Sequence, residues 1–151
     1  MIVEQIKISA KPEDVFAYIE QLDRHGEWQE AVLSAHKEPE GPTRIGTRNT
    51  EKRQMPGGPR EVTSEIYEYD PPQRIATKSV GGGPITATVT ISIEPADEGS
   101  RLTFTLDLQG HGVGKVFVIF ARKSASGQVP KDLASLKQKI ESGEAAEPAE
   151  S

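Results

Sequence analysis

His111 is the residue of this chain whose type and setting are most typical of acid–base chemistry. It lies between Gly110 and Gly112, where flexible backbone and a following helix start could present an imidazole and favour its neutral form. A neutral imidazole accepts protons near neutral pH, so His111 is a candidate general base. A turn histidine exposed to water explains the same pattern, and we interpret His25 and His36 as surface residues.

Two other side chains are candidates for chemistry on a bound carbonyl compound. Tyr67 is a second candidate acid or base, and Arg48 lies on a predicted strand from which it could hold a ligand oxygen. Asn49 and Thr50 follow it and offer further polar groups. A solvated strand face explains residues 48–53 equally well.

The sequence shows no pattern for cysteine chemistry, a metal site or a phosphate-binding loop. The chain has no cysteine, which removes disulfides, thiolate nucleophiles and cysteine metal sites. Its three histidines show no short ligand spacing, so we predict no metal. The glycine-rich segment 81–84 lacks the Lys and Ser/Thr of a phosphate loop and is interpreted as a turn. No cofactor is predicted.

The elements that must position these residues begin with a strand and a helix. Isoleucines alternate with polar residues over 2–8 and predict a strand with one buried face. Pro12 predicts a helix start with Lys11 as N-cap, because proline at the first helical position costs no hydrogen bond. A second short helix is predicted to hold Trp28.

An antiparallel meander is predicted for the middle of the chain. Clusters of proline and glycine separate runs of strand length between residues 38 and 98. Apolar residues alternate with polar ones over 85–93 and again over 102–108, which predicts a hairpin with two apolar rows side by side.

The last predicted element is a helix that covers this apolar side. Its residues at helical spacing form two groups, Val113, Phe117, Phe120 and Ser124, then Val129, Leu133, Leu136 and Ile140. Gly127 and Pro130 lie at the gap, so we expect a kink, or a restart with Ser126 as cap. The predicted fold class is α+β.

Length and charge set the broad class of protein. The 151 residues predict one domain over 1–141, and the small acidic segment 142–151 is predicted to be a disordered tail. Of the net charge of −5, the last ten residues account for −3, which leaves −2 for the rest. A nearly neutral body argues against a nucleic-acid partner. Without a signal-peptide pattern or an apolar run long enough to span a membrane, a cytoplasmic location is expected.

Local signatures along the chain resemble the START-related, birch-pollen-allergen-like helix-grip (SRPBCC) superfamily, particularly its polyketide cyclase/dehydrase branch. They are residues 12–16 with Trp28, residues 41–47 at the start of a strand, residues 66–72 with 74–76, and residues 132–137. The resemblance implies a curved antiparallel sheet of about seven strands wrapped around a long C-terminal helix, with two short helices between the first two strands. It also implies a pocket for a hydrophobic or amphipathic small molecule.

Aromatic residues are the main candidates for lining such a pocket, although plain core packing explains them too. Phe117 and Phe120 are preferred, because small neighbours such as Gly114 and Ala121 leave room beside them. The predicted ligand-binding set is Trp28, Arg48, Tyr67, Phe104, Phe117, Phe120 and Ser124.

Three functions remain open from the sequence. The first is binding of a lipid- or polyketide-like molecule by a monomer or homodimer. The second is a cyclase or dehydrase that uses His111 or Tyr67 as acid or base and Arg48 to hold an oxygen. The third is a protein-interaction or co-chaperone module with a filled core.

Overall fold

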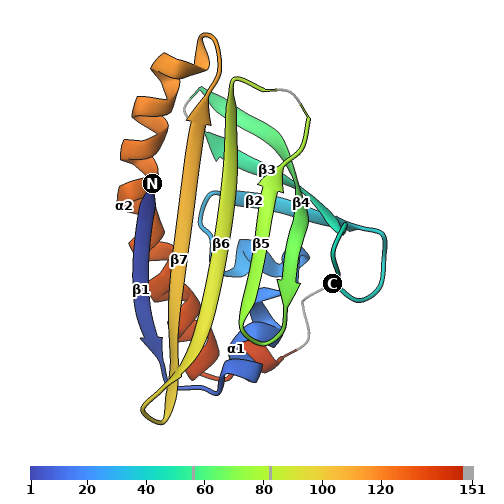
Figure 1. The fold of residues 1–151 in the computed structure, drawn as a ribbon, viewed down its shortest axis with the longest axis vertical. Coiled ribbons are helices and arrows are strands. Elements are labelled where there is room, and N and C mark those ends of the chain that lie inside the picture. The colour runs from blue at the N-terminus through green and yellow to red at the C-terminus, as the bar shows by residue number, and fades with distance from the viewer. Residues whose placement is uncertain (56, 82, 148–151) are drawn as a thin grey trace.

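Seven antiparallel strands form one sheet in the computed structural model, in the order β1-β7-β6-β5-β4-β3-β2 (Figure 1). The structure describes residues 1–55, 57–81 and 83–147. The strands are β1 (Ile2–Ile8), β2 (Val32–Glu38), β3 (Arg48–Met55), β4 (Gly58–Asp70), β5 (Arg74–Ser79), β6 (Ile85–Ala96) and β7 (Gly99–Gly110). Together with the long C-terminal helix α2 (Gly114–Glu141), they confirm the predicted α+β helix-grip class.

Two short helices connect β1 to β2, as predicted. Helix α1 (Pro12–Ile19) begins at Pro12 after Lys11, whose side chain makes no capping hydrogen bond. Its inward residues Val15, Phe16 and Ile19 are buried. The second is a 3₁₀ helix over Leu22–Glu27, and Trp28 follows it directly as the C-cap residue rather than lying inside it.

The β6–β7 hairpin supplies the central part of the core. Its register places Ile91 opposite Phe104 and Ile93 opposite Leu102, so the two apolar rows lie side by side on one face. Ile6 of β1 is in turn opposite Leu102. Alternating residues of a strand point to opposite faces, which explains why apolar side chains with a spacing of two form a continuous buried surface.

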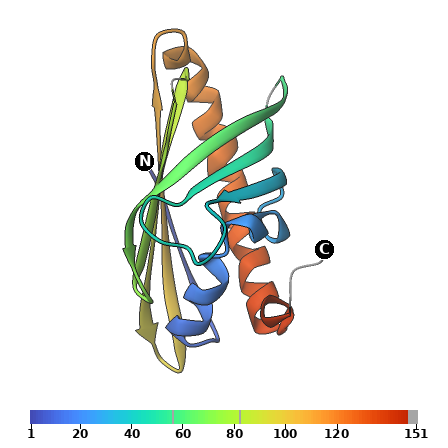
Figure 2. The same cartoon turned by 90° about the vertical axis from the view of Figure 1, so that its right-hand side faces the viewer.

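The sheet curves around α2 (Figure 2). Strands β3 and β4 cross over toward the helix, while α1 lies between the sheet and the C-terminal half of α2. At the opposite end, the start of α2 lies against the residue before β6. A Cβ on Gly114 would be 1.8 Å from the carbonyl oxygen of Pro84, so only glycine permits this contact.

Helix α2 is continuous through Pro130. The predicted restart at Ser126 is wrong, because the Ser126 hydroxyl donates to the Lys123 carbonyl at 2.9 Å and caps nothing. Pro130 lies on an exposed side of the helix. The carbonyl that loses its partner can therefore bind water, which makes an internal proline tolerable there.

The two apolar groups of α2 lie on opposite faces of the helix. Phe120 and Val129 are nine residues apart, and at about 100° per residue this separation is two and a half turns. Val129, Leu133 and Leu136 are buried against the sheet, whereas Phe117 and Phe120 are exposed. The inward positions of the first half are instead Val118 and the small residues Ala121 and Ala125.

The predicted tail, residues 142–151, lies only partly within the described residues. Ser142 is the C-cap of α2, and a 3₁₀ turn follows over Glu144–Ala146. The Arg24 guanidinium donates to the carbonyl oxygen of Ala145 at 3.3 Å. Residues 148–151 lie outside the described residues.

Candidate functional site

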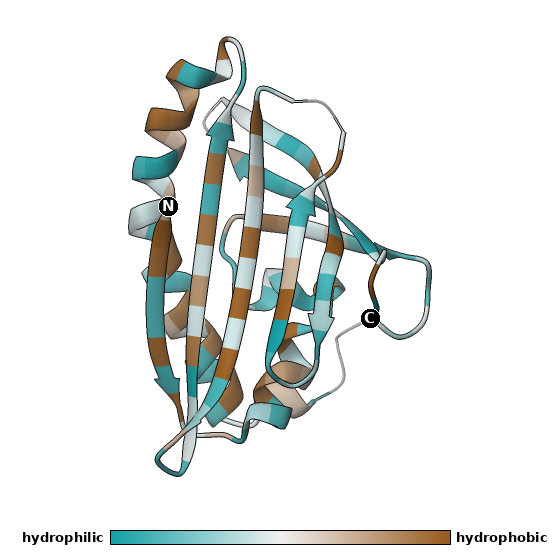
Figure 3. Ribbon diagram, in the orientation of Figure 1, coloured by the Kyte–Doolittle hydropathy of each residue, from teal (hydrophilic) through white to brown (hydrophobic). Residues whose placement is uncertain are grey.

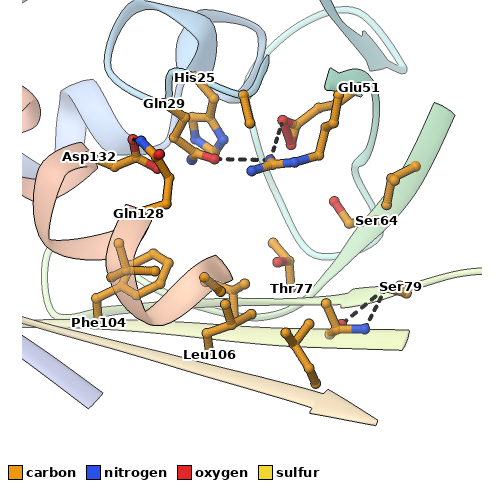
Figure 4. A pocket seen from close by; sticks show the side chains of 18 of the residues that line it. His25, Gln29, Glu51, Ser64, Thr77, Ser79, Phe104, Leu106, Gln128 and Asp132 are labelled. Atoms are coloured by element: carbon orange, nitrogen blue, oxygen red, sulfur yellow. Dashed lines mark hydrogen bonds and ion pairs between the residues drawn. The ribbon is translucent and has the colours of Figure 1, made fainter. Parts of the chain in front are cut away.

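A cavity of about 300 Å³ lies between the sheet and α2 (Figure 4). Its apolar wall is formed by inward residues of β5, β6 and β7 and by α2, among them Ile75, Val89, Ile91, Phe104, Leu106 and Leu133. The volume is at the lower end of the range for small-molecule sites.

Polar side chains gather on the opposite wall. His25, Gln29 and Glu51 lie across the cavity from Phe104 and Leu106 (Figure 4). Arg53 links two elements there: its Nη1 is 3.2 Å from Oε2 of Glu51 and 3.0 Å from Oε1 of Gln29. The positive charge of Arg53 is thus compensated by a carboxylate from the same strand.

Two buried polar atoms of the cavity wall have no hydrogen-bond partner among the described residues. They are Nε1 of Trp28 and Oδ1 of Asn49, and both residues line the cavity. Trp28 and Asn49 are 2% and 1% exposed. The Asn49 amide nitrogen donates to the Leu22 carbonyl at 3.2 Å, which fixes Oδ1 as the free acceptor. An unpartnered buried polar atom is costly, so a ligand group that pairs with it gains affinity.

A carboxylate from α2 completes the polar wall. Oδ1 of Asp132 accepts from Gln128 at 2.8 Å and from the backbone N–H of Glu30 at 3.3 Å. Burial raises the pKa of Asp132 above its ordinary value, while these two hydrogen bonds act in the opposite direction.

The surroundings of His25 favour its neutral imidazole form. Burial lowers its pKa, which outweighs the opposing influence of the nearby Glu51 carboxylate. Nε2 lies 3.0 Å from the Ile19 carbonyl oxygen, which can only accept, so Nε2 carries the proton. In the neutral ring, Nδ1 is then a lone-pair acceptor.

The cavity opens between the end of β3 and the middle of α2. Gln54 and Ser124 both line the cavity and are nevertheless exposed to solvent. Met55 and Ala121, the chain neighbour of Gln54 and a residue one turn before Ala125, also line the cavity.

The structure brings three of the predicted ligand-binding residues to this cavity, namely Trp28, Phe104 and Ser124. Phe117 and Phe120 differ from the expectation. They are 58% and 64% exposed and do not line the cavity, because the inward face of this part of α2 carries Ala121 and Ala125 instead.

The remaining candidates, Arg48, Tyr67 and His111, do not line the cavity. Arg48 pairs with Glu65 at 3.2 Å on an exposed strand surface. The Tyr67 ring stands 5.6 Å from Nζ of Lys78, and His111 lies 3.2 Å from the Thr86 hydroxyl at the β7–α2 junction. The structure therefore does not assemble Arg48, Tyr67 and His111 into one site.

Sequence reasoning missed most of the polar wall. His25 lines the cavity, contrary to its expected surface position, and Asp132 entered the sequence analysis only within a family signature. Asn49, named there as a polar candidate, does line the cavity. Asn49, Glu51 and Arg53 do alternate along β3. That signal was available, but both faces of β3 are polar, so the alternation alone does not say which face is inward.

The described part of the chain contains neither a cluster of metal-ligating side chains nor a helix that could span a membrane. Within residues 1–55, 57–81 and 83–147, no cluster of three or more His, Asp or Glu side chains could hold a metal ion. No helix in those ranges has the length and apolar character needed to cross a membrane.

Comparisons with known proteins agree with this architecture. The chain is 29% identical over 132 residues to the uncharacterized protein Rv1546 of Mycobacterium tuberculosis, covering 83% of this chain and 88% of that protein. A START superfamily protein from Mycobacterium smegmatis matches with a TM-score of 0.73 and 14% identity, over 93% of this chain and 97% of its own. The di-domain ARO/CYC protein StfQ from the steffimycin biosynthetic pathway matches with a TM-score of 0.75 and 15% identity, over 97% of this chain and 51% of its own.

These two structural likenesses show the fold. Membership of a family is shown by a match of the sequence to a family model. The model of the family described as polyketide cyclase / dehydrase and lipid transport matches residues 2–141, which is nearly all of the folded chain. The chain therefore belongs to the polyketide cyclase/dehydrase and lipid transport family.

Proposed function

We propose that this protein binds one amphipathic small molecule in the cavity, with an apolar body and a neutral polar group. One observation carries the proposal: an apolar cavity of about 300 Å³ contains the unpartnered buried Nε1 of Trp28 and Oδ1 of Asn49. A filled protein core gives no reason to leave a buried donor and a buried acceptor without partners.

The chemistry of the polar wall defines the group that the ligand presents. Nε1 of Trp28 can only donate and Oδ1 of Asn49 can only accept. A hydroxyl both accepts and donates, so an alcohol or phenol complements the two kinds of atom. A carboxylate is disfavoured, because the charge of Arg53 is already balanced by Glu51 and Asp132 adds a further negative charge.

The family membership supports the same class of molecule. Lipid-like chains and polyketide-like rings both combine a large apolar surface with a few oxygens. The cavity offers matching parts, with Phe104 and Leu106 on one wall and polar side chains on the other (Figure 4).

Trp28 gives a direct test, because it is the one tryptophan of the chain and lines the cavity. Its fluorescence is followed during titration with dodecan-1-ol, dodecanoate and dodecane, and with 1-naphthol. We expect saturable changes with the two hydroxyl compounds and weaker binding of dodecanoate and dodecane. Ala125→Phe, which fills the cavity, should abolish the response, whereas Ala134→Phe on the exposed side of α2 should not. Equal responses in both variants would refute the proposal.

A second candidate function is cyclase- or dehydrase-type chemistry on a bound carbonyl compound. It is favoured by neutral His25, whose Nε2 is held by the Ile19 carbonyl and whose Nδ1 can accept a proton. A suitable probe is exchange of the α-protons of 1-tetralone in deuterated water. Loss of catalysed exchange in His25→Gln, with exchange retained in His111→Ala, Tyr67→Phe and Arg48→Ala, would support His25 as the base. Exchange retained in His25→Gln but lost in the other three variants would instead assign the catalysis to His111, Tyr67 and Arg48.

A further inference from the structure

The outward face of the first half of α2 is an exposed apolar surface beside the cavity opening. Val113, Val116, Phe117 and Phe120 are spaced as i, i+3, i+4 and i+7, so they share one face of the helix. They are 73%, 61%, 58% and 64% exposed, and Ile119 beside them is 63% exposed. The same turns carry hydrophobic colours in Figure 3. We call these five residues the α2 apolar face.

Scattered exposed apolar residues are ordinary, but a contiguous set that includes two phenylalanines is characteristic of a contact surface. The charges around the α2 apolar face indicate what it contacts. Lys115 and Lys123 lie on the same turns and are exposed, and Lys131 follows. Arg122 is exposed too, but its Nη2 donates to the Leu108 carbonyl at 2.7 Å. No Asp or Glu occurs between Asp107 and Asp132, although the chain as a whole carries a net charge of −5.

We propose that the α2 apolar face docks on the surface of a lipid bilayer that contains anionic phospholipid. A helix with Phe and Val on one side and Lys beside them lies in the interface, with its apolar side chains among the lipids and its cations at the headgroups. A second copy of this chain fits poorly, because pairing the two faces would bring like charges together. No helix of the described ranges could span the bilayer, so the contact is superficial.

The α2 apolar face lies next to the cavity opening, which suggests a role for membrane docking in ligand uptake. This role rests on the proposed function. Ser124 follows Phe117 and Phe120 on the same side of α2, at i+7 and i+4, and it lines the cavity while remaining exposed. The apolar face therefore leads to the cavity opening. A protein docked through it presents the opening to the membrane, from which an amphipathic molecule can enter without crossing water.

Vesicle co-sedimentation tests the docking. Vesicles of phosphatidylcholine, with and without phosphatidylglycerol, are mixed with the full chain at low salt. We expect binding only when phosphatidylglycerol is present, and loss of that binding at high salt. Phe117→Ser/Phe120→Ser should lower partitioning by about tenfold or more per phenylalanine. Lys115→Gln/Lys123→Gln should lower it by about fivefold per lysine.

The controls separate docking from folding and from the cavity. Val3→Ser/Leu33→Ser removes two exposed apolar side chains elsewhere, 55% and 53% exposed, and should leave vesicle binding unchanged. The Phe117/Phe120 variant should keep the Trp28 response to 1-naphthol, so failure of the docking proposal and failure of the cavity proposal are distinguishable. Binding of wild type to neither vesicle, or equal binding by the phenylalanine variant, would overturn the docking proposal. A wild-type dimer that this variant dissociates would overturn it in favour of self-association.

Discussion

Nη1 of Arg53 lies 3.2 Å from Oε2 of Glu51, and both side chains line the cavity from the same strand, β3. A guanidinium facing an apolar cavity would be strongly unfavourable alone, so the carboxylate two residues earlier makes it tolerable. Under the proposed function, the pair also sets the charge that a ligand meets, because Arg53 is already paired with Glu51.

Glu51→Gln is therefore expected to change both stability and ligand preference. Removing the carboxylate leaves Arg53 without its charged partner and should lower the free energy of unfolding by about 1 to 3 kcal/mol. It should also improve binding of dodecanoate relative to dodecan-1-ol, because the uncompensated guanidinium attracts a carboxylate. Urea unfolding and Trp28 fluorescence measure the two effects. An unchanged preference would show that the pair does not set ligand charge, and Arg53→Gln in a double-mutant cycle gives their coupling.

The stability of the protein should depend on pH through His25. Burial lowers its pKa below the ordinary 6.5, so the unfolded chain binds a proton that the folded chain does not. Stability should thus fall as the pH drops through about 6.5, and this contribution should level off below the folded-state pKa. His25→Gln should flatten that slope, whereas His36→Gln, at an exposed position, should retain it. The measurement is urea unfolding from pH 7.5 to 5; an identical slope in wild type and His25→Gln would contradict it.

Two glycines of α2 should respond to alanine in opposite directions. In Gly114→Ala the new Cβ would meet the Pro84 carbonyl at 1.8 Å, so the junction between β6 and α2 must shift and stability should fall by about 2 kcal/mol or more. Gly127 has no atom within 4 Å of the corresponding position. Gly127→Ala should raise stability by about 0.5 to 1 kcal/mol, because alanine loses less entropy in a helix. Thermal unfolding of the two variants checks both signs, and a stabilising Gly114→Ala would refute the close contact.

Alanine substitutions of Phe104 and Phe117, which the sequence analysis both placed at the pocket, should differ in their effect on stability. Phe104 is 9% exposed and packs in the core beside the cavity, so Phe104→Ala should cost about 3 kcal/mol of unfolding free energy and weaken ligand binding. Phe117 is 58% exposed, and Phe117→Ala should change stability by no more than about 0.5 kcal/mol. Comparable losses in both variants would mean that the outward orientation of Phe117 is incorrect.

Strands and helix starts were predictable because each rests on a local rule. Isoleucine alternation in β1, proline at the start of α1 and the two apolar rows of β6 and β7 each depend on a few neighbouring residues. The continuity of α2 could not be predicted in this way, because it depends on Pro130 lying on the exposed side of the helix. That side is decided by the packing of Val129 and Leu133 against the sheet.

The candidate site was harder to predict than the fold. Helical spacing groups Phe117 with Phe120, but it does not state which side of the helix faces the cavity. The sheet packs against the later stripe of α2, and this turns the earlier stripe outward. On β3 polar residues alternate, but only the tertiary structure decides that Asn49, Glu51 and Arg53 are the ones that line the cavity.

The central claim, that the cavity holds a small amphipathic molecule, is tested most directly by native mass spectrometry of gently purified protein against its denatured mass. The account predicts a discrete additional mass in wild type that is lost on denaturation, retained in Ala134→Phe and absent in Ala125→Phe. The retained molecule should contain a hydroxyl on an apolar body. If wild type has only its bare mass and also fails to bind dodecan-1-ol or 1-naphthol, the binding account is contradicted.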